Sequence, residues 1–275
     1  MALCPYCGAE IRDGVKFCTE CGGKLTQSTP RPQQAALVGN TGVLLGRAAR
    51  QARLEAVYAE DEIISDFAYN AVLLGVVIWG LLVNFLMCRF LGSEITWWLY
   101  WHNINPILPV VVYFVCAIAG ILISAKSHKP LISFLGYNLV VIPFGVMLAI
   151  VVEGYGGIDA RVVTDAFLYT LFITVGMTGA ALAFPKLFSK LGGALLGTLG
   201  GLVICEILLL IFRVDQSVTD WIAAGLFSLY IGYDVYRSQQ FARTVDNAVD
   251  CALDIYLDIA NLFLRLLSIL GKKDD

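Results

Sequence analysis

The hydrophobic positions of this chain gather into seven long runs, which follow the more polar residues 1–65. The runs cover 66–90, 106–125, 130–152, 162–184, 191–212, 217–236 and 248–270. Each run is close to the ~20 residues that an α-helix needs to cross a bilayer. The pattern therefore predicts an all-α membrane protein with a seven-transmembrane-helix bundle over residues 66–271.

The last run differs from the others because it carries one polar stripe. The members of this stripe are Asn247, Asp250, Asp254, Asp258, Asn261 and Arg265. Spacings of three or four residues place them all on one face of a helix. Inside a membrane, such a face has to turn toward other protein or toward water. The stripe therefore predicts that the last helix is central in the bundle.

The composition agrees with a membrane protein and disfavours other classes. Hydrophobic residues make up 58% of the chain and charged residues only 15%, and the mean hydropathy is +0.75, a balance that ordinary soluble domains do not show. The net charge is -3, and no basic tract is interleaved with aromatic residues. We therefore expect the lipid bilayer as a partner, and we do not expect nucleic acid.

The distribution of lysine and arginine predicts the orientation. Loops on the side of the N-terminus hold Lys126, Lys129, Lys186, Lys190, Arg237 and Arg243, and the opposite side and its flanks hold Arg89, Arg161 and Arg213. By the positive-inside rule the N-terminus is cytoplasmic. Seven crossings would place Lys272 and Lys273 outside, so the last segment either spans the membrane or re-enters it. Because the chain begins with cysteines and has no basic, apolar leader, we expect a bacterial plasma-membrane protein.

The N-terminal segment has the spacing of a structural zinc site. Two Cys-x-x-Cys pairs, each followed by glycine, consist of Cys4, Cys7, Cys18 and Cys21. Four thiolates at this spacing suit one tetrahedral Zn²⁺ and leave no open position for catalysis. Disulfides or redox thiols are the alternative, which a reducing cytoplasmic location disfavours. The segment resembles the zinc ribbons that begin many bacterial membrane proteins, over about residues 3–25.

The chain thus divides into four parts. Residues 1–25 form the zinc ribbon, and residues 26–42 are a flexible linker rich in proline, glutamine and serine. Residues 43–65 have the pattern of an amphipathic juxtamembrane helix, which lies either on anionic headgroups or in solvent. Residues 66–271 form the transmembrane domain. A tethered ribbon of this kind is suited to recruit a cytoplasmic protein partner.

The last two runs carry the strongest candidate for a functional site. A short connection makes these helices antiparallel neighbours, so that Asp234 of the sixth run can meet Asp258 of the seventh, with Asp254 and Asp250 as alternatives at similar depth. Carboxylates within a membrane are expensive and usually mark an ion or proton pathway.

Two carboxyl groups in contact cannot both be ionised cheaply, and therefore they share a proton. The shared proton ties the helices together, and its loss leaves two anions that repel each other and attract a cation. The pair is therefore a candidate pH sensor and gate. Calcium prefers six to eight oxygen ligands, and two carboxylates would bind it weakly, as permeation requires.

At these residues the chain resembles the Bax inhibitor-1 family, also called the transmembrane Bax inhibitor motif family. The stretches that carry the resemblance are Phe227-Ser-Leu-Tyr-Ile-Gly-Tyr-Asp234 and Leu253-Asp-Ile-Tyr-Leu-Asp258-Ile-Ala-Asn261-Leu-Phe-Leu-Arg265-Leu-Leu, within a seven-segment pattern over about 66–270. The resemblance implies six helices around a central seventh and a pH-sensitive calcium leak. It also implies that Asp234 and Asp258 are the pH sensor. A basic residue after the second segment would latch onto the pair, and Lys126 is its counterpart here, where arginine would be expected.

Four further residues are candidates for auxiliary roles at this site. They are Asp254, Lys126, Arg265 and Glu206. Arg265 and Glu206 depart from the family pattern and can re-tune the aspartate pair. Glu206 lies well inside the fifth run, where it needs a partner or water, so it is either a second site or a structural hydrogen-bonded group.

Three rival interpretations of the chain remain. Intramembrane aspartyl proteolysis also uses two aspartates, one as base and one as acid, but the required Gly-x-Gly before the second aspartate is replaced by Ile255-Tyr-Leu. We therefore predict that the protein is not an enzyme. A second interpretation is a membrane-anchored adaptor or stress regulator that recruits a partner through its ribbon. In the third, the aspartate pair is only a structural clamp between two helices.

Overall fold

The computed structural model describes residues 2–3, 10–11, 62–105, 107–127, 129–212 and 217–272. It divides the chain into two compact units, Met1–Ala56 and Val57–Asp275. In the first unit, strands β1 (Ala2–Leu3) and β2 (Glu10–Ile11) pair antiparallel, with Ala2 opposite Ile11. The two strands flank Cys4 and Cys7 in the sequence. All four cysteines of the predicted zinc site lie outside the described residues, as does the predicted linker at 26–42.

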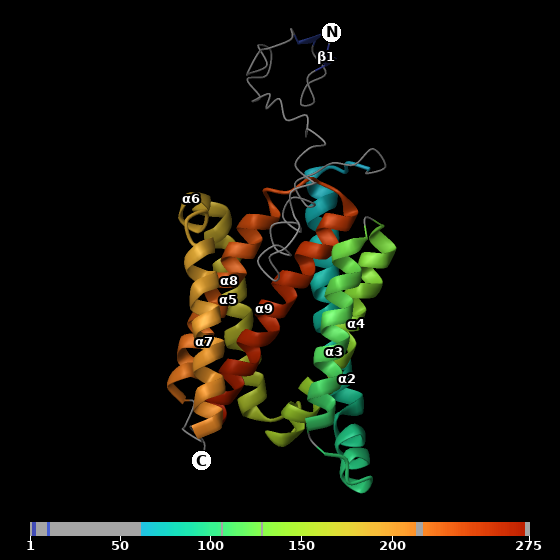
Figure 1. The fold of residues 1–275 in the computed structure, drawn as a ribbon, viewed down its shortest axis with the longest axis vertical. Coiled ribbons are helices and arrows are strands. Elements are labelled where there is room, and N and C mark those ends of the chain that lie inside the picture. The colour runs from blue at the N-terminus through green and yellow to red at the C-terminus, as the bar shows by residue number, and fades with distance from the viewer. Residues whose placement is uncertain are drawn as a thin grey trace. The chain divides into compact units, whose positions relative to one another are not determined.

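In the described part of the second unit, the regular secondary structure consists of helices only, as predicted (Figure 1). Its helices are α2 (Asp66–Trp101), α3 (Ile107–Lys126), α4 (Pro130–Gly154), α5 (Arg161–Ala183), α6 (Pro185–Phe188), α7 (Gly192–Phe212), α8 (Ser217–Ser238) and α9 (Val245–Gly271). Each predicted run corresponds to one long helix, and α6 is a single additional turn between α5 and α7. By length and hydropathy, α2, α4, α5 and α7 can each cross a membrane, and α3 has a shorter apolar segment, Leu108–Ser124.

Helix α2 is longer than predicted and continues beyond residue 90 to Trp101. Arg89 ended the predicted apolar run, but its Nη1 lies 2.9 Å from Oδ2 of Asp159, in the connection between α4 and α5. The charge is therefore paired at the end of the bundle. The extension carries Trp97, Trp98 and Trp101, all exposed, and tryptophan is enriched where a helix leaves the hydrocarbon.

The starts of α2 and α9 are fixed by capping side chains. Oγ of Ser65 accepts a hydrogen bond from N of Ala68 at 3.2 Å, and Oγ1 of Thr244 accepts one from N of Asn247 at 3.1 Å. Such caps satisfy backbone N–H groups that have no partner within the helix. Residues 62–65, the end of the amphipathic helix predicted at 43–65, are not helical, and residues 43–61 lie outside the described part of the chain.

Helix α9 packs against α2, α4, α5 and α8, and in Figure 1 it runs obliquely between α5 and α8 on one side and α2 and α4 on the other. On the face opposite the polar stripe, Tyr256 is fully buried. Its ring meets Tyr137 and Phe144 of α4 edge to face, with centroids 5.7 and 6.1 Å away. Its hydroxyl accepts a hydrogen bond from Nδ2 of Asn84 in α2 at 2.5 Å. One aromatic residue thus joins three helices.

Two glycines let α3 and α4 approach until their backbones touch. A Cβ added to Gly120 would lie 2.5 Å from the carbonyl oxygen of Gly136, and a Cβ on Gly136 would lie 2.7 Å from that of Gly120. Small residues commonly allow such close crossings between membrane helices. The crossing holds the α3–α4 hairpin together next to the first turns of α9.

Gly136→Ala should destabilise the protein, because the new methyl group has to push α3 away from α4. Overpacking of this kind costs about 1–3 kcal/mol of unfolding free energy. Unfolding in detergent micelles measures the change. Gly179→Ala in α5 is the matched control, since a Cβ there meets open space. A Gly136→Ala variant as stable as this control would contradict the close crossing.

Candidate functional site

Asp258 and Asp234 meet where α9 and α8 pack against each other. Asp258 is only 8% exposed and Asp234 is half-buried. Their carboxyl groups are hydrogen bonded, and Asp254, one turn earlier on α9, places a third carboxyl group next to Asp258. An ionised carboxylate can only accept hydrogen bonds, so a bond between two carboxyl groups needs a proton on one of them. Oδ2 of Asp258 is buried and has no hydrogen-bond partner among the residues that the structure describes.

The acidic residues in the first turns of α9 have serine partners from the α3–α4 hairpin. Oγ of Ser133, at the start of α4, donates to Oδ1 of Asp246 at 2.5 Å. Oγ of Ser124, near the end of α3, donates to Oδ1 of Asp250, which is completely buried. Asp250 was an alternative partner for Asp234, and the structure instead brings it to Ser124. The two serines were not among the predicted site residues.

Lys126, the predicted basic latch, lies in the last turn of α3 and is exposed. It makes no hydrogen bond or ion pair with any other residue that the structure describes. The latch therefore stays a prediction. His, Cys, Asp and Glu side chains within the described ranges do not form a cluster of three or more that could hold a metal ion.

Arg265 and Glu206, two of the predicted auxiliary residues, bind each other at the other end of the polar stripe. Nη2 of Arg265 donates to Oε2 of Glu206 at 2.8 Å, and Nη1 lies 2.7 Å from Oε1. Nη1 also donates to Oδ1 of Asp220, in the first turn of α8, at 2.9 Å. We call this three-residue group the Arg265 clamp. It joins α7, α8 and α9.

Asp220 anchors the clamp, although the sequence did not single it out. It is 3% exposed and accepts two further hydrogen bonds at Oδ2, from Ser268 at 2.8 Å and from Lys272 at 3.2 Å. Asp220 lies in the first turn of α8, where an acidic side chain is favourable next to the helix N-terminus. Its position alone therefore did not mark it as a site residue. The only signal was Arg265, a cation within an apolar segment that required an anionic partner.

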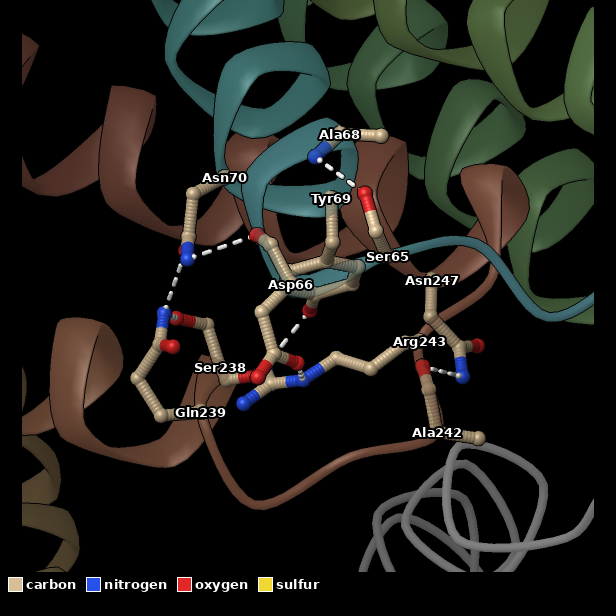
Figure 2. A network of polar contacts seen from close by, with 10 residues as sticks. All are labelled: Ser65, Asp66, Ala68, Tyr69, Asn70, Ser238, Gln239, Ala242, Arg243 and Asn247. Carbon is tan, nitrogen blue, oxygen red and sulfur yellow. Dashed lines mark hydrogen bonds and ion pairs between the residues drawn. The ribbon is translucent and has the colours of Figure 1, made fainter. Parts of the chain in front are cut away.

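A second polar network ties the connection between α8 and α9 to the start of α2 (Figure 2). Arg243 in this connection donates from Nε to Oδ1 of Asp66 at 2.9 Å and from Nη1 to the carbonyl oxygen of Ser238 at 3.3 Å. Its guanidinium group also lies over the ring of Tyr69, 4.8 Å from the centroid. Asp66 is the first residue of α2, so the network contacts the N-terminal end of this helix.

Further bonds surround this arginine. The Tyr69 hydroxyl donates to the carbonyl oxygen of Ser238 at 2.9 Å, and Nε2 of Gln239 donates to Oδ1 of Asn70 at 2.8 Å. The backbone N of Ile64 donates to the carbonyl oxygen of Arg243 at 2.8 Å. The helices that carry Asp234 and Asp258 are therefore held at their shared connection by α2.

Comparison with known proteins identifies the family. The family model described as "Inhibitor of apoptosis-promoting Bax1" matches residues 66–275, which include helices α2 to α9. The chain belongs to the Bax inhibitor family. A zinc-ribbon domain model matches residues 3–25. Both resemblances noted in the sequence are thereby confirmed, and the Bax inhibitor match includes the aspartate pair and the Arg265 clamp.

Several relatives from distant organisms are similar to this Bax inhibitor family protein. Protein lifeguard 4 of Mus musculus is 29% identical over 165 residues, which cover 58% of this chain and 68% of the relative. Bax inhibitor 1 of Schizosaccharomyces pombe is 25% identical over 176 residues, 62% of this chain and 64% of the relative. An uncharacterized protein of Campylobacter jejuni is 34% identical over 118 residues, 42% of this chain and 48% of the relative. The chain thus spans between about half and about two thirds of the lengths of these relatives.

Together with the apolar helices, membership of the Bax inhibitor family makes this an integral membrane protein. The matched region begins at Asp66, the first residue of α2. The network around Arg243 therefore links the start of the family domain, at α2, to the connection between α8 and α9.

The two halves of the Arg243–Asp66 pair should contribute unequally to stability. Asp66 is 80% exposed, so Asp66→Asn should lower the free energy of unfolding by less than about 1 kcal/mol. Arg243→Gln also removes the bond to Ser238 and the contact with Tyr69, and should lower it by about 1–3 kcal/mol. Unfolding of both variants in detergent compares them. Equal losses would mean that the contacts of Arg243 inside the bundle contribute nothing.

Proposed function

We propose that this Bax inhibitor family protein is a pH-sensitive calcium or cation leak channel, gated by the proton that Asp234 and Asp258 share. The observation that carries the proposal is the hydrogen bond between these two carboxyl groups, on adjacent helices of a membrane protein. Buried titratable pairs of this kind are typical of ion and proton pathways. The pair is the candidate pH sensor and gate.

Proton loss opens the gate. With one proton, the pair bridges α8 and α9 and presents little net charge to a passing cation. Without it, two facing anions repel each other and water enters to solvate them. Asp254 next to Asp258 adds to the negative potential that draws a cation in. The two facing carboxylates of the pair provide at most four oxygens, fewer than the six to eight ligands of a tight calcium site, so the ion is released again.

The proposed channel also has a defined topology in the membrane. The seven long helices of the described residues all cross the membrane, with α9 as the central helix, which its packing against α2, α4, α5 and α8 supports. The N-terminus lies in the cytoplasm. The similarity to a Campylobacter jejuni protein supports a bacterial plasma membrane. Lys126 remains the candidate latch on the pair.

Calcium entry into proteoliposomes should therefore depend on pH. From about pH 6 to about pH 8, a range that brackets a carboxyl group holding a shared proton, entry should rise several-fold. Asp258→Asn or Asp234→Asn should give low entry at both values, because an amide donates to the remaining carboxylate without a titratable proton. A calcium-sensitive dye inside the vesicles measures the flux.

Asp159→Asn is the matched control for these substitutions, since Asp159 is 84% exposed at the end of the bundle. It should leave the pH dependence unchanged. A folded wild-type protein with equally negligible calcium entry at both pH values would remove the channel. If Asp258→Asn lowers stability and leaves permeability unchanged, the pair is a structural clamp.

A second function, recruitment of a cytoplasmic partner, is favoured by the match of residues 3–25 to a zinc-ribbon domain. Cys4, Cys7, Cys18 and Cys21 would hold one structural Zn²⁺, whose binding energy would fold a segment too short for a core of its own. The β1–β2 pairing on either side of the first two cysteines fits such a ribbon. The names of the relatives, Bax inhibitor 1 and lifeguard 4, support a regulator of stress or cell death as the wider role.

Deletion of residues 1–25 separates the two functions. The truncated protein should keep its calcium entry and lose both its bound zinc and its cytoplasmic partner. Elemental analysis of the full chain should give one zinc per chain, and Cys18→Ser should lower this value. Loss of calcium entry on deletion would show that the ribbon is part of the channel and not an independent module.

A further inference from the structure

A cavity that the aspartate pair does not line lies within the apolar part of the bundle. It has a volume of about 250 Å³ and is lined by residues of α2, α4, α5 and α9 and by Ile158, in the connection between α4 and α5. Helix α9 packs against both α2 and α5, and in Figure 1 it runs between them. The cavity thus has walls from both sides of α9.

This cavity opens toward lipid. Phe85 of α2 and Phe167 and Leu171 of α5 line it and are exposed, whereas Ile259 and Ala260 of α9 line it and are buried. The exposed side chains form its rim, and α9 forms its inner wall. Helices α2 and α5 are apolar and long enough to cross a bilayer, so an opening between them faces hydrocarbon. Molecules dissolved in the membrane can therefore enter from the side.

Two residues that line the cavity carry an unpaired oxygen. Oγ1 of Thr174 on α5 and Oδ1 of Asn84 on α2 are both buried and have no hydrogen-bond partner among the described residues. Thr170, one turn before Thr174, instead donates to the carbonyl oxygen of Ala166 at 2.7 Å, as threonine in a helix commonly does. Buried polar atoms are nearly always hydrogen bonded in native proteins. The two oxygens are therefore places where a ligand with a polar group gains binding free energy.

The lining selects a ligand that is apolar except for a hydroxyl group. A hydroxyl can donate to Oδ1 of Asn84 or accept from the hydroxyl of Thr174, and a hydrocarbon can do neither. A charged headgroup is disfavoured, because none of the described lining residues is charged. Thr174 also lies roughly 14 Å from the nearer end of α5, a depth at which a charge is costly.

The size of the cavity limits the ligand further. An apolar cavity of about 150 Å³ is large enough to bind benzene. The cavity of about 250 Å³ between α2 and α5 therefore has room for a ring with a short alkyl chain.

We propose that this cavity is an intramembrane binding site for a neutral, lipid-soluble alcohol or phenol, with Thr174 and Asn84 as the residues that bind its hydroxyl group. The site does not depend on the aspartate pair being a gate. A ligand in it contacts α2, α5 and the two residues of α9 that follow Asp258, Ile259 and Ala260. It therefore stabilises the packing of α9 between the other two helices, because it binds the folded protein.

The test compares 4-butylphenol with butylbenzene, which lacks the hydroxyl group, on the wild-type protein in lipid nanodiscs. Both ligands should raise the unfolding temperature by mass action. The phenol should reach the same increase at a membrane concentration roughly three- to tenfold lower, which corresponds to one hydrogen bond. Unfolding followed by circular dichroism measures this difference.

The thiol of Cys88 shows whether the ligand occupies this cavity. Cys88 lines the cavity and is 7% exposed, so a bound ligand should slow its alkylation by N-ethylmaleimide, which mass spectrometry reports for each cysteine. Protection should follow the same order of the two ligands. Cys205, an exposed residue of α7, is outside the cavity and should react at the same rate with and without ligand.

Thr174→Val tests the hydroxyl contact, because valine keeps the shape of threonine and removes the oxygen. It also removes an unpaired buried hydroxyl, so the variant without ligand should unfold at a temperature no lower than wild type. The advantage of the phenol over butylbenzene should fall to within about twofold. Thr178→Val, one turn later on α5 and outside the cavity lining, is the matched control and should keep the full advantage.

Three results would overturn the proposal. Equal potency of the two ligands on wild type would mean that the cavity takes any apolar molecule and that the hydroxyl contact is wrong. If neither ligand raises the unfolding temperature or protects Cys88, the cavity is not a binding site. If the phenol keeps its full advantage in Thr174→Val, Thr174 does not bind its hydroxyl group. None of these results bears on calcium entry, which tests the channel separately.

Discussion

The structure depends on one constraint, which is that polar side chains of α9 need partners in a region without bulk water. An unpaired charge in the bilayer interior costs several kcal/mol. Four neighbouring helices supply these partners. Ser133 of α4 binds Asp246, and Ser124 of α3 binds Asp250. Asp234 of α8 binds Asp258, and Glu206 of α7 and Asp220 of α8 bind Arg265. Together these bonds fix the rotation and the depth of α9 in the bundle.

The two charged centres on the stripe satisfy this constraint in different ways. Arg265 has opposite charges as partners, and its contacts do not need any titratable proton. Asp258 has like charges as neighbours, and its contact with Asp234 exists only while one of them is protonated. The first centre is stable and the second is conditional. A helix that is fixed at Arg265 can lose its contact at Asp258 without losing its place in the bundle.

The sequence predicted the elements well and their partners poorly. The seven runs became α2, α3, α4, α5, α7, α8 and α9, and the contact between Asp234 and Asp258 followed from the short connection and the spacing of carboxylates. Hydrophobic periodicity describes one helix at a time, and so it could not show that Asp220 would meet Arg265, 45 residues away, or that Arg243 would reach Asp66, 177 residues away. Those pairs depend on how helices pack. The extension of α2 was missed because Arg89 finds its partner outside its own helix.

The most direct test of the account is whether Asp234 and Asp258 share a proton inside the folded protein. Infrared difference spectra of the protein in lipid, between about pH 6 and about pH 8, report the C=O stretch of a protonated carboxyl group. The account predicts that such a band is present at the lower pH, decreases at the higher pH, and is missing from both Asp234→Asn and Asp258→Asn. A spectrum in which both substitutions leave this band unchanged would contradict the shared proton, and with it the gate.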